Sequence, residues 1–114
     1  MLELLLGGQT AEKVLLYLNE QDRGYGREIA RACGLPVTPV NRQLAKFAEA
    51  GYLVSQVFGR ARVYTWNPRN PLVASLRVFL SDAFSMLPSS QQAALSMQRR
   101  RPRNAAKRLE PIDE

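Results

Sequence analysis

Four side chains with strong hydrogen-bonding groups lie within residues 41–46 of the chain: Asn41, Arg42, Gln43 and Lys46. The carboxamides of Asn and Gln can each form two hydrogen bonds with adenine in the major groove of DNA, and the guanidinium of Arg can form two with guanine. A lysine one turn further along is better placed to meet a phosphate. These residue types therefore favour recognition of a duplex, and the alternative is an ordinary solvated helix face.

An apolar stripe accompanies these polar side chains. Val40, Leu44 and Phe47 follow spacings of four and then three residues, which predicts a helix with one face turned inward. We expect Thr38 to be its N-cap and Pro39 its first helical residue, where a missing N–H has no cost. The polar side chains then lie on the outward face.

A shorter helix is expected just before this one, over residues 27–33. Gly34 follows at the place where a helix C-terminus favours a residue that tolerates positive φ, and Leu35 is the apolar plug of the turn. The two helices, with Gly51 ending the second, form a helix-turn-helix, in which the first helix crosses the DNA backbone. Arg27, near the start of that first helix, is therefore a candidate for a phosphate contact.

After the second helix the pattern changes to a period of two, rich in β-branched and aromatic residues. Segments 52–57 and 62–66, joined by a Gly-containing tip at 58–61, predict a β-hairpin. Arg60 and Arg62 lie at and beside the tip, where they could enter a minor groove or hold phosphates. Alternatively, they only keep an exposed hairpin soluble. The side chains expected to turn toward the helices are Leu53, Val57, Val63 and Trp66.

Two further helices are expected to flank this unit. One covers residues 11–19, with an inward stripe of Ala11, Val14, Leu15 and Leu18. The other is capped by Asn70, has Pro71 at its first position and ends near Leu87. Its apolar stripe is wide enough to cover its own domain or to form a dimer seam, and the dimer is favoured. The seam would consist of Leu72, Leu76, Phe79, Leu80, Ala83, Phe84 and Leu87. The apolar residues 1–6 either fray or complete this interface as an arm.

The length of 114 residues fits one domain, over residues 1–87, followed by a basic, Pro-containing tail over residues 88–114. The formal charge of +6 favours anionic partners, nucleic acid first. Six of the 16 basic residues lie within 99–108, so the tail could follow a DNA backbone and add affinity that depends on salt and not on sequence. The alternative is a solvated tail.

Several classes of function lack the residues that they need. The chain has no His and only Cys33, so neither a Cys/His metal site nor His-based acid–base catalysis is expected. We therefore expect no enzyme, no metal and no cofactor. A lone cysteine fits a reducing cytoplasm, and no apolar run approaches the length needed to span a membrane.

The order of helices and hairpin resembles the winged helix-turn-helix of the arsenic-repressor-like (ArsR-like) transcriptional regulators, through the segments REIARACGL, TPVNRQLAKFAEAGYLV and GRARVYTWNP. More closely, it resembles small winged-helix domains found alone or fused ahead of minimal nucleotidyltransferases in prokaryotes. In those, the wing also ends in Tyr-x-x-Asn, followed by Pro-Leu and a helix, as at residues 64–67 and 71–72. The resemblance covers roughly residues 9–87. The paired metal ligands of ArsR-like sensors and the active-site segment of a nucleotidyltransferase are both missing.

Residues and resemblance together predict an α+β, mainly helical winged helix-turn-helix with a two-stranded wing and a long C-terminal dimerisation helix. The expected function is sequence-specific binding of double-stranded DNA by a dimeric transcriptional repressor. The DNA-binding residues would be Arg27, Thr38, Pro39, Asn41, Arg42, Gln43, Lys46, Arg60 and Arg62. One alternative is an interaction module or antitoxin-like partner of a separate nucleotidyltransferase chain. Another is an RNA or architectural DNA binder driven by the tail.

Overall fold

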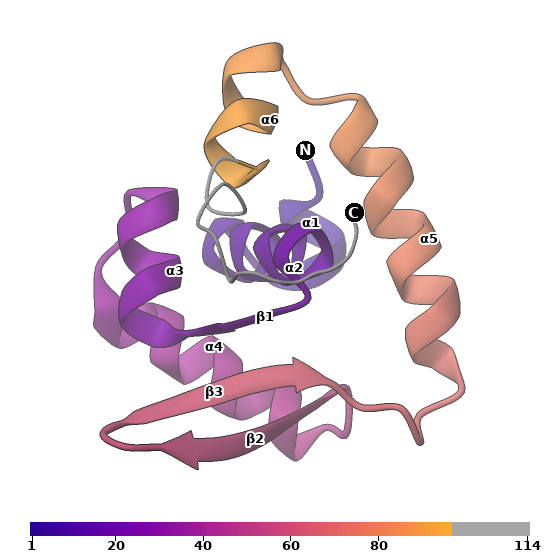
Figure 1. Cartoon of the computed structure of the whole chain (residues 1–114). Coiled ribbons are helices and arrows are strands. Elements are labelled where there is room, and N and C mark those ends of the chain that lie inside the picture. The colour runs from indigo at the N-terminus through magenta and orange to yellow at the C-terminus, as the bar shows by residue number, and fades with distance from the viewer. Residues whose placement is uncertain (97–114) are drawn as a thin grey trace, which may run out of the picture.

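The computed structural model describes residues 1–96, which form six helices and three strands (Figure 1). The helices are α1 (Glu3–Leu6), α2 (Gln9–Gln21), α3 (Gly26–Cys33), α4 (Val37–Glu49), α5 (Leu72–Ser85) and α6 (Ser89–Ser96). The strands are β1 (Arg23–Tyr25), β2 (Leu53–Phe58) and β3 (Ala61–Trp66). This mainly helical α+β arrangement, in which a helix-turn-helix precedes a hairpin, confirms the predicted winged-helix fold.

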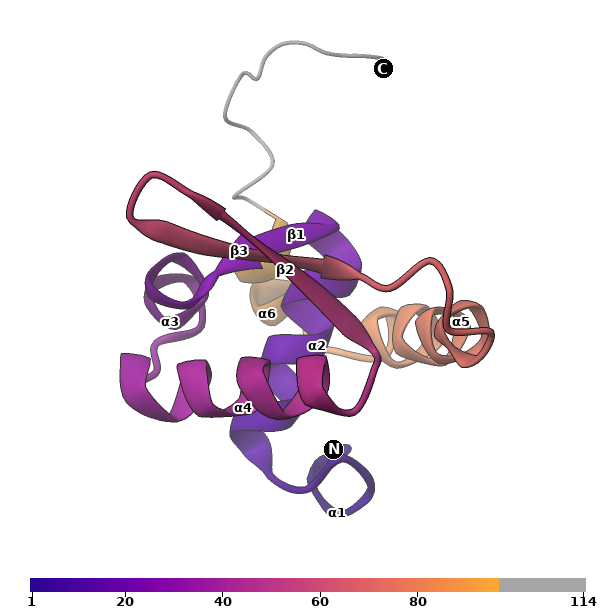
Figure 2. The ribbon, with the colours of Figure 1, turned by 90° about the horizontal axis from the view of Figure 1, so that it is seen from below.

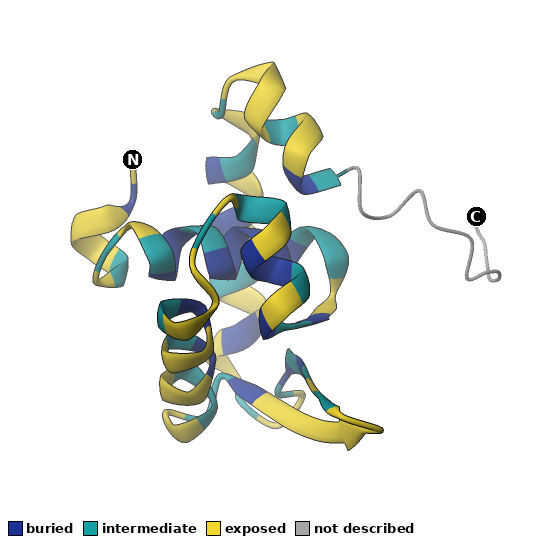
Figure 3. Ribbon diagram, turned by 90° about the vertical axis from the view of Figure 1, so that its left-hand side faces the viewer, coloured by how far each residue is buried: buried dark blue, intermediate teal, exposed yellow. Residues whose placement is uncertain are grey.

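Helix α2 is the centre of the domain, because the other five described helices and the sheet surround it (Figures 1 and 2). Its predicted inward stripe is confirmed, since four residues are at most 2% exposed: Ala11, Val14, Leu15 and Leu18. Leu16 and Tyr17 are also buried, because neighbouring helices cover the remaining sides of α2 (Figure 3). The helix runs from Gln9 to Gln21 and is therefore longer than predicted.

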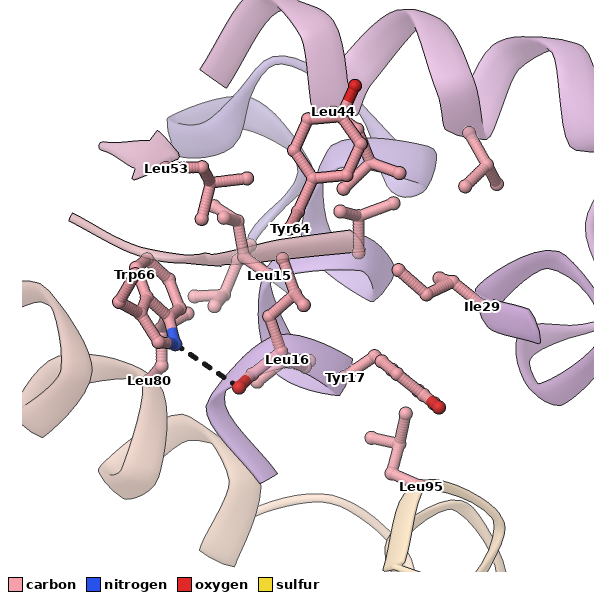
Figure 4. Packing of buried hydrophobic residues seen from close by; sticks show 14 of the residues in the cluster. Leu15, Leu16, Tyr17, Ile29, Leu44, Leu53, Tyr64, Trp66, Leu80 and Leu95 are labelled. Atoms are coloured by element: carbon pink, nitrogen blue, oxygen red, sulfur yellow. Dashed lines mark hydrogen bonds between the residues drawn. The ribbon is translucent and has the colours of Figure 1, made fainter. Parts of the chain in front are cut away.

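The wing belongs to a three-stranded antiparallel sheet with the order β1-β3-β2. Trp66 pairs with Leu53, and Tyr64, two residues earlier, lies on the same side of the sheet. All three side chains are buried in the core (Figure 4). The indole Nε1 of Trp66 donates a hydrogen bond of 3.2 Å to the carbonyl oxygen of Leu18, which ties the base of the wing to α2.

Two of the wing residues predicted to turn inward are not part of the core, Val63 and Val57. Val63 is an odd number of residues from Trp66, so the pleat directs it to the opposite side of the sheet, and Tyr64 takes the inward place. Val57 has the correct parity but is 56% exposed. Val57 lies next to the tip, and in β2 only Leu53, at the base of the hairpin, is buried.

The turn between α3 and α4 forms as its sequence predicts. Gly34 has φ 67° and ψ 38°, and its N–H and that of Leu35 both donate to the carbonyl oxygen of Ala30. However, α4 begins earlier than predicted, at Val37, with Pro36 as its N-cap at φ −63° and ψ 147°. Thr38 and the proline after it, predicted as N-cap and first residue, are instead the second and third helical residues. A proline is tolerated there because the first N–H groups of a helix have no intrahelical partner.

Helix α5 forms largely as predicted, but its apolar residues divide between two sides. It begins at Leu72, so Pro71, predicted as its first residue, is the N-cap in place of Asn70. Oδ1 of Asn70 still accepts a hydrogen bond of 2.9 Å from the N–H of Leu72. Leu80 and Ala83 are buried within the domain, against the core around α2. Their assignment to a dimer seam was therefore wrong, because they are already covered. Leu72 and Phe79 remain exposed, and Leu76, Phe84 and Leu87 are half-buried.

The folded domain extends beyond the boundary predicted at residue 87. Residues 89–96 form α6, which packs on α2 and α3, and its Leu95 is part of the core. The basic cluster at 99–108 lies outside the described residues. Among the helices of residues 1–96, none combines the length and the apolar composition needed to cross a bilayer.

Candidate nucleic-acid interface

The outward face of α4 is open to solvent along its length. Thr38, Asn41, Arg42 and Lys46 are exposed, whereas Pro39 and Gln43 are half-buried. Val40 and Leu44, on the opposite face, are fully buried and fix the helix on the core. Seen from below, α4 runs across the front of the molecule with the wing beside it (Figure 2). The predicted polar face is therefore accessible to a large ligand.

A groove of about 720 Å³ opens between the start of α3, the first turns of α4 and the tip of the wing. Four of the predicted DNA-binding residues line it: Arg27, Asn41, Arg60 and Arg62. Among the described residues of this lining, none is acidic. The groove thus gathers three guanidinium groups from segments more than 30 residues apart in the chain, and such a concentration of positive charge favours a polyanion.

The start of α3 contributes backbone as well as a cation. Arg27 is the second residue of α3 and is exposed. The N–H groups of a first helical turn carry a partial positive charge, which favours an anion nearby. The carboxylate of the neighbouring Glu28 does not line the groove, because it is turned toward Tyr17 and Gly24. Burial first, and then the charge of Glu28, raises the pKa of the Tyr17 phenol.

The wing holds one of its arginines in place. The Nη1 of Arg62 donates a hydrogen bond of 3.0 Å to the Oγ of Ser55 on the neighbouring strand. The other guanidinium N–H groups of Arg62 can still serve a phosphate, because a guanidinium carries five donors. Arg60 lies in the two-residue turn between β2 and β3, after Gly59 at φ 59°.

The groove also contains apolar residues that sequence reasoning did not select. Val37 and Phe58 line it together with the arginines, and both side chains are exposed. Val37 was missed because α4 was predicted to begin after it. Phe58 was assigned only to the tip of the hairpin, and no local pattern shows which side chains of a tip face a helix. Thr38, Arg42, Gln43 and Lys46 do not line the groove but continue the polar surface along α4.

This surface offers binding groups and no arrangement for holding a metal. Within residues 1–96 no cluster of three or more His, Cys, Asp or Glu side chains is placed to bind a metal ion. The chemistry that the interface supports is the donation of hydrogen bonds by guanidinium, ammonium and amide groups to oxygen and nitrogen acceptors.

Comparison with known proteins gives a match for the helical part of this interface. The searches of curated proteins and of solved structures return no match. A family model described as winged helix-turn-helix DNA-binding matches residues 9–54. That stretch contains α2, β1, α3 and α4 and reaches the first residues of β2. In this stretch, which holds both helices of the helix-turn-helix, the chain is similar to winged helix-turn-helix domains that bind DNA.

Proposed function

We propose that the protein is a transcriptional regulator that binds double-stranded DNA at specific sequences, and that it acts as a dimeric repressor. The observation that carries this proposal is the groove beside α4, where Arg27 of α3 meets Arg60 and Arg62 of the wing. The match of residues 9–54 to a DNA-binding family supports the same class of ligand.

The geometry suggests how a duplex would lie on the protein. The α4 helix enters the major groove, with Asn41 and Arg42 toward the base edges and Lys46 toward a phosphate. The backbone of one strand then follows the arginine-lined groove between α4 and the wing. The wing tip reaches the next minor groove, where arginine side chains bind well. Bound at a promoter, the protein would exclude polymerase by occupying the DNA.

A dimer would present two copies of α4 to half-sites about one turn of DNA apart. The surface best suited to pair two copies is the outer side of α5, where Leu72 and Phe79 are exposed. This helix lies on the side of the molecule opposite to the wing tip (Figure 1). Pairing through α5 would therefore leave α4 and the wing free.

The first test is selection of bound sequences from a random pool of double-stranded DNA, followed by titrations with Arg42→Ala and Lys46→Ala. Arg42→Ala should remove a base contact, which relaxes the preference at one base pair and costs about 1–3 kcal/mol of binding free energy. Lys46→Ala should remove a phosphate contact, which weakens binding to all sequences. It should also lower the slope of log K against log salt concentration by about 1. If neither substitution changes binding, this face of α4 does not read DNA.

A second candidate function is the binding of another protein chain through exposed apolar residues. Leu4 and Leu5 of α1 are largely exposed, as are Leu72 and Met86 at the two ends of α5. Such residues could hold a separate nucleotidyltransferase chain, for which the domain would be an interaction module or antitoxin-like partner. Light scattering discriminates between the two functions, because a homodimer favours the repressor, whereas a monomer that co-purifies with a second chain favours the module.

A further inference from the structure

The true start of α4 changes which side chains stand at the reading end of the helix. Because α4 begins at Val37, this valine and not Thr38 opens its first turn. Its side chain is 40% exposed and lies outside the core cluster. The N-terminal residues of a recognition helix are the ones that contact base edges. An apolar side chain therefore occupies a position where a polar one is usually expected.

The surroundings of Val37 show that this apolar group faces the ligand site. Val37 lines the arginine-rich groove together with Arg27 and Asn41. Asn41 is four residues further along α4, so the two side chains lie one turn apart on the same face. Val37 is neither in the core cluster nor among the apolar residues that pack against it. It also has no donor or acceptor with which to bind a phosphate or a polar base edge.

We propose that Val37 recognises the C5-methyl group of a thymine in the major groove. This inference rests on the proposed function and adds a specificity-determining residue to it. The methyl group is the one apolar feature that a base presents on that edge, and apolar side chains distinguish thymine by contact with it. Contact between the valine and the methyl group removes both from water, which is favourable.

The test removes only that methyl group. In the site selected from the random pool, each thymine is replaced singly by deoxyuridine, and the dissociation constant is measured for each duplex. Loss of one buried methyl should weaken wild-type binding about fourfold at one position. In Val37→Ala the same replacement should leave the affinity unchanged, because the contact is already gone. Val54→Ala is the matched control, since Val54 is 41% exposed and lies outside the groove, and it should keep the fourfold effect.

Thr38 is the neighbour that could make this contact instead, because its side chain also carries a methyl group and is exposed. Thr38→Ser removes that methyl and keeps the hydroxyl. The proposal is overturned if the deoxyuridine effect disappears in Thr38→Ser but persists in Val37→Ala, or if no deoxyuridine weakens binding. If no DNA sequence is enriched from the pool at all, the proposed function itself fails, and this inference falls with it.

Discussion

The side-chain oxygen of Asn41 lies in the space that a side chain on Gly26 would need. A Cβ built on Gly26 would stand 1.7 Å from Oδ1 of Asn41 and 2.8 Å from its Cγ, and the three nearest atoms all belong to Asn41. Gly26, the first residue of α3, thus has no side chain at the place where the side-chain amide of Asn41 packs against it. This contact positions the Asn41 amide at the wall of the groove before any ligand arrives, which lowers the entropy cost of binding.

This contact predicts a coupling between the two positions. Gly26→Ala should displace the Asn41 amide and weaken DNA binding by an amount similar to that of Asn41→Ala. The double variant should bind no more weakly than Asn41→Ala alone, because both changes remove one contact with DNA. The expected interaction energy is about 1–2 kcal/mol in a double-mutant cycle of binding free energies.

Thermal unfolding provides the control for that cycle. If Gly26→Ala lowers the melting temperature, truncation of Asn41 should restore it, because the added methyl then has space. Independent, additive losses of DNA affinity would show that the Asn41 amide does not depend on Gly26.

A second prediction concerns Arg77, which joins α5 to the end of α2. Its Nε donates to Oδ1 of Asn19 at 2.8 Å, and its Nη2 donates to the Asn19 carbonyl oxygen at 2.9 Å and to Oδ1 of Asp22 at 2.6 Å. The guanidinium carbon also lies 5.5 Å from the ring centroid of Trp66. Arg77→Ala should lower the free energy of unfolding by about 1–3 kcal/mol, because a carbonyl and an amide oxygen lose a charged donor.

Urea unfolding measures this loss, and Arg69→Ala is the matched control. Arg69 is exposed just before the same helix, and within residues 1–96 its side chain forms no ion pair or hydrogen bond. Its removal should therefore change stability by less than about 0.5 kcal/mol. Arg77→Lys should recover only part of the loss, because an ammonium group cannot reproduce the planar fork of the guanidinium. Equal stabilities for Arg77→Ala and Arg69→Ala would show that these contacts do not stabilise the domain.

The sequence predicted the elements whose signals are local. Gly34 marks the helix end by its positive φ, and the alternating segments around Gly59 give the hairpin. The start of α4 was placed wrongly because two start signals lie next to each other, Pro36 and the pair Thr38-Pro39. Either could begin a helix, and local propensity does not choose between them.

Tertiary packing decided the remaining features. The prediction for β3 combined Val63 and Trp66, which an odd spacing places on opposite faces, and packing on the helices selects the face of Trp66 and Tyr64. Leu80 was assigned to a dimer because the periodicity shows that a side is apolar but not what covers it. Arg27, Arg60 and Arg62 were each selected from their own segments, whereas their meeting in one groove depends on how α3 and the wing fold together.

A third prediction follows from the environment of Cys33. Burial raises the pKa of this thiol to about 11, despite the opposing charge of Lys13, and its Sγ lies 3.9 Å from the Lys13 carbonyl oxygen. In the unfolded chain the thiol titrates near pH 9. Between these two values the unfolded state loses the proton while the folded state keeps it. The free energy of unfolding should therefore fall as pH rises through this window.

Urea unfolding from pH 8 to pH 10.5 tests this dependence, with Cys33→Ala as the comparison. The variant should show a shallower fall, but not a flat profile, because the raised pKa of Tyr17 acts in the same direction. A thiol-specific reagent at neutral pH should also label native Cys33 far more slowly than the unfolded chain, since the thiolate is the reactive form. Labelling at equal rates would show that the thiol is not protected.

Substitutions at the neighbouring residues Phe79 and Leu80 can distinguish an effect on dimerisation from an effect on folding, because the two side chains lie on different sides of α5. Phe79 is 40% exposed and Leu80 is 0% exposed. If two copies pair through the outer side of α5, Phe79→Glu should convert the dimer to a monomer, as measured by light scattering, while the melting temperature of a dilute sample changes little. Leu80→Ala should instead lower the free energy of unfolding by about 2–5 kcal/mol through a core cavity, with the folded fraction still dimeric. A wild-type protein that stays monomeric at high concentration, or a Phe79→Glu variant that stays dimeric, would rule out pairing through the outer side of α5.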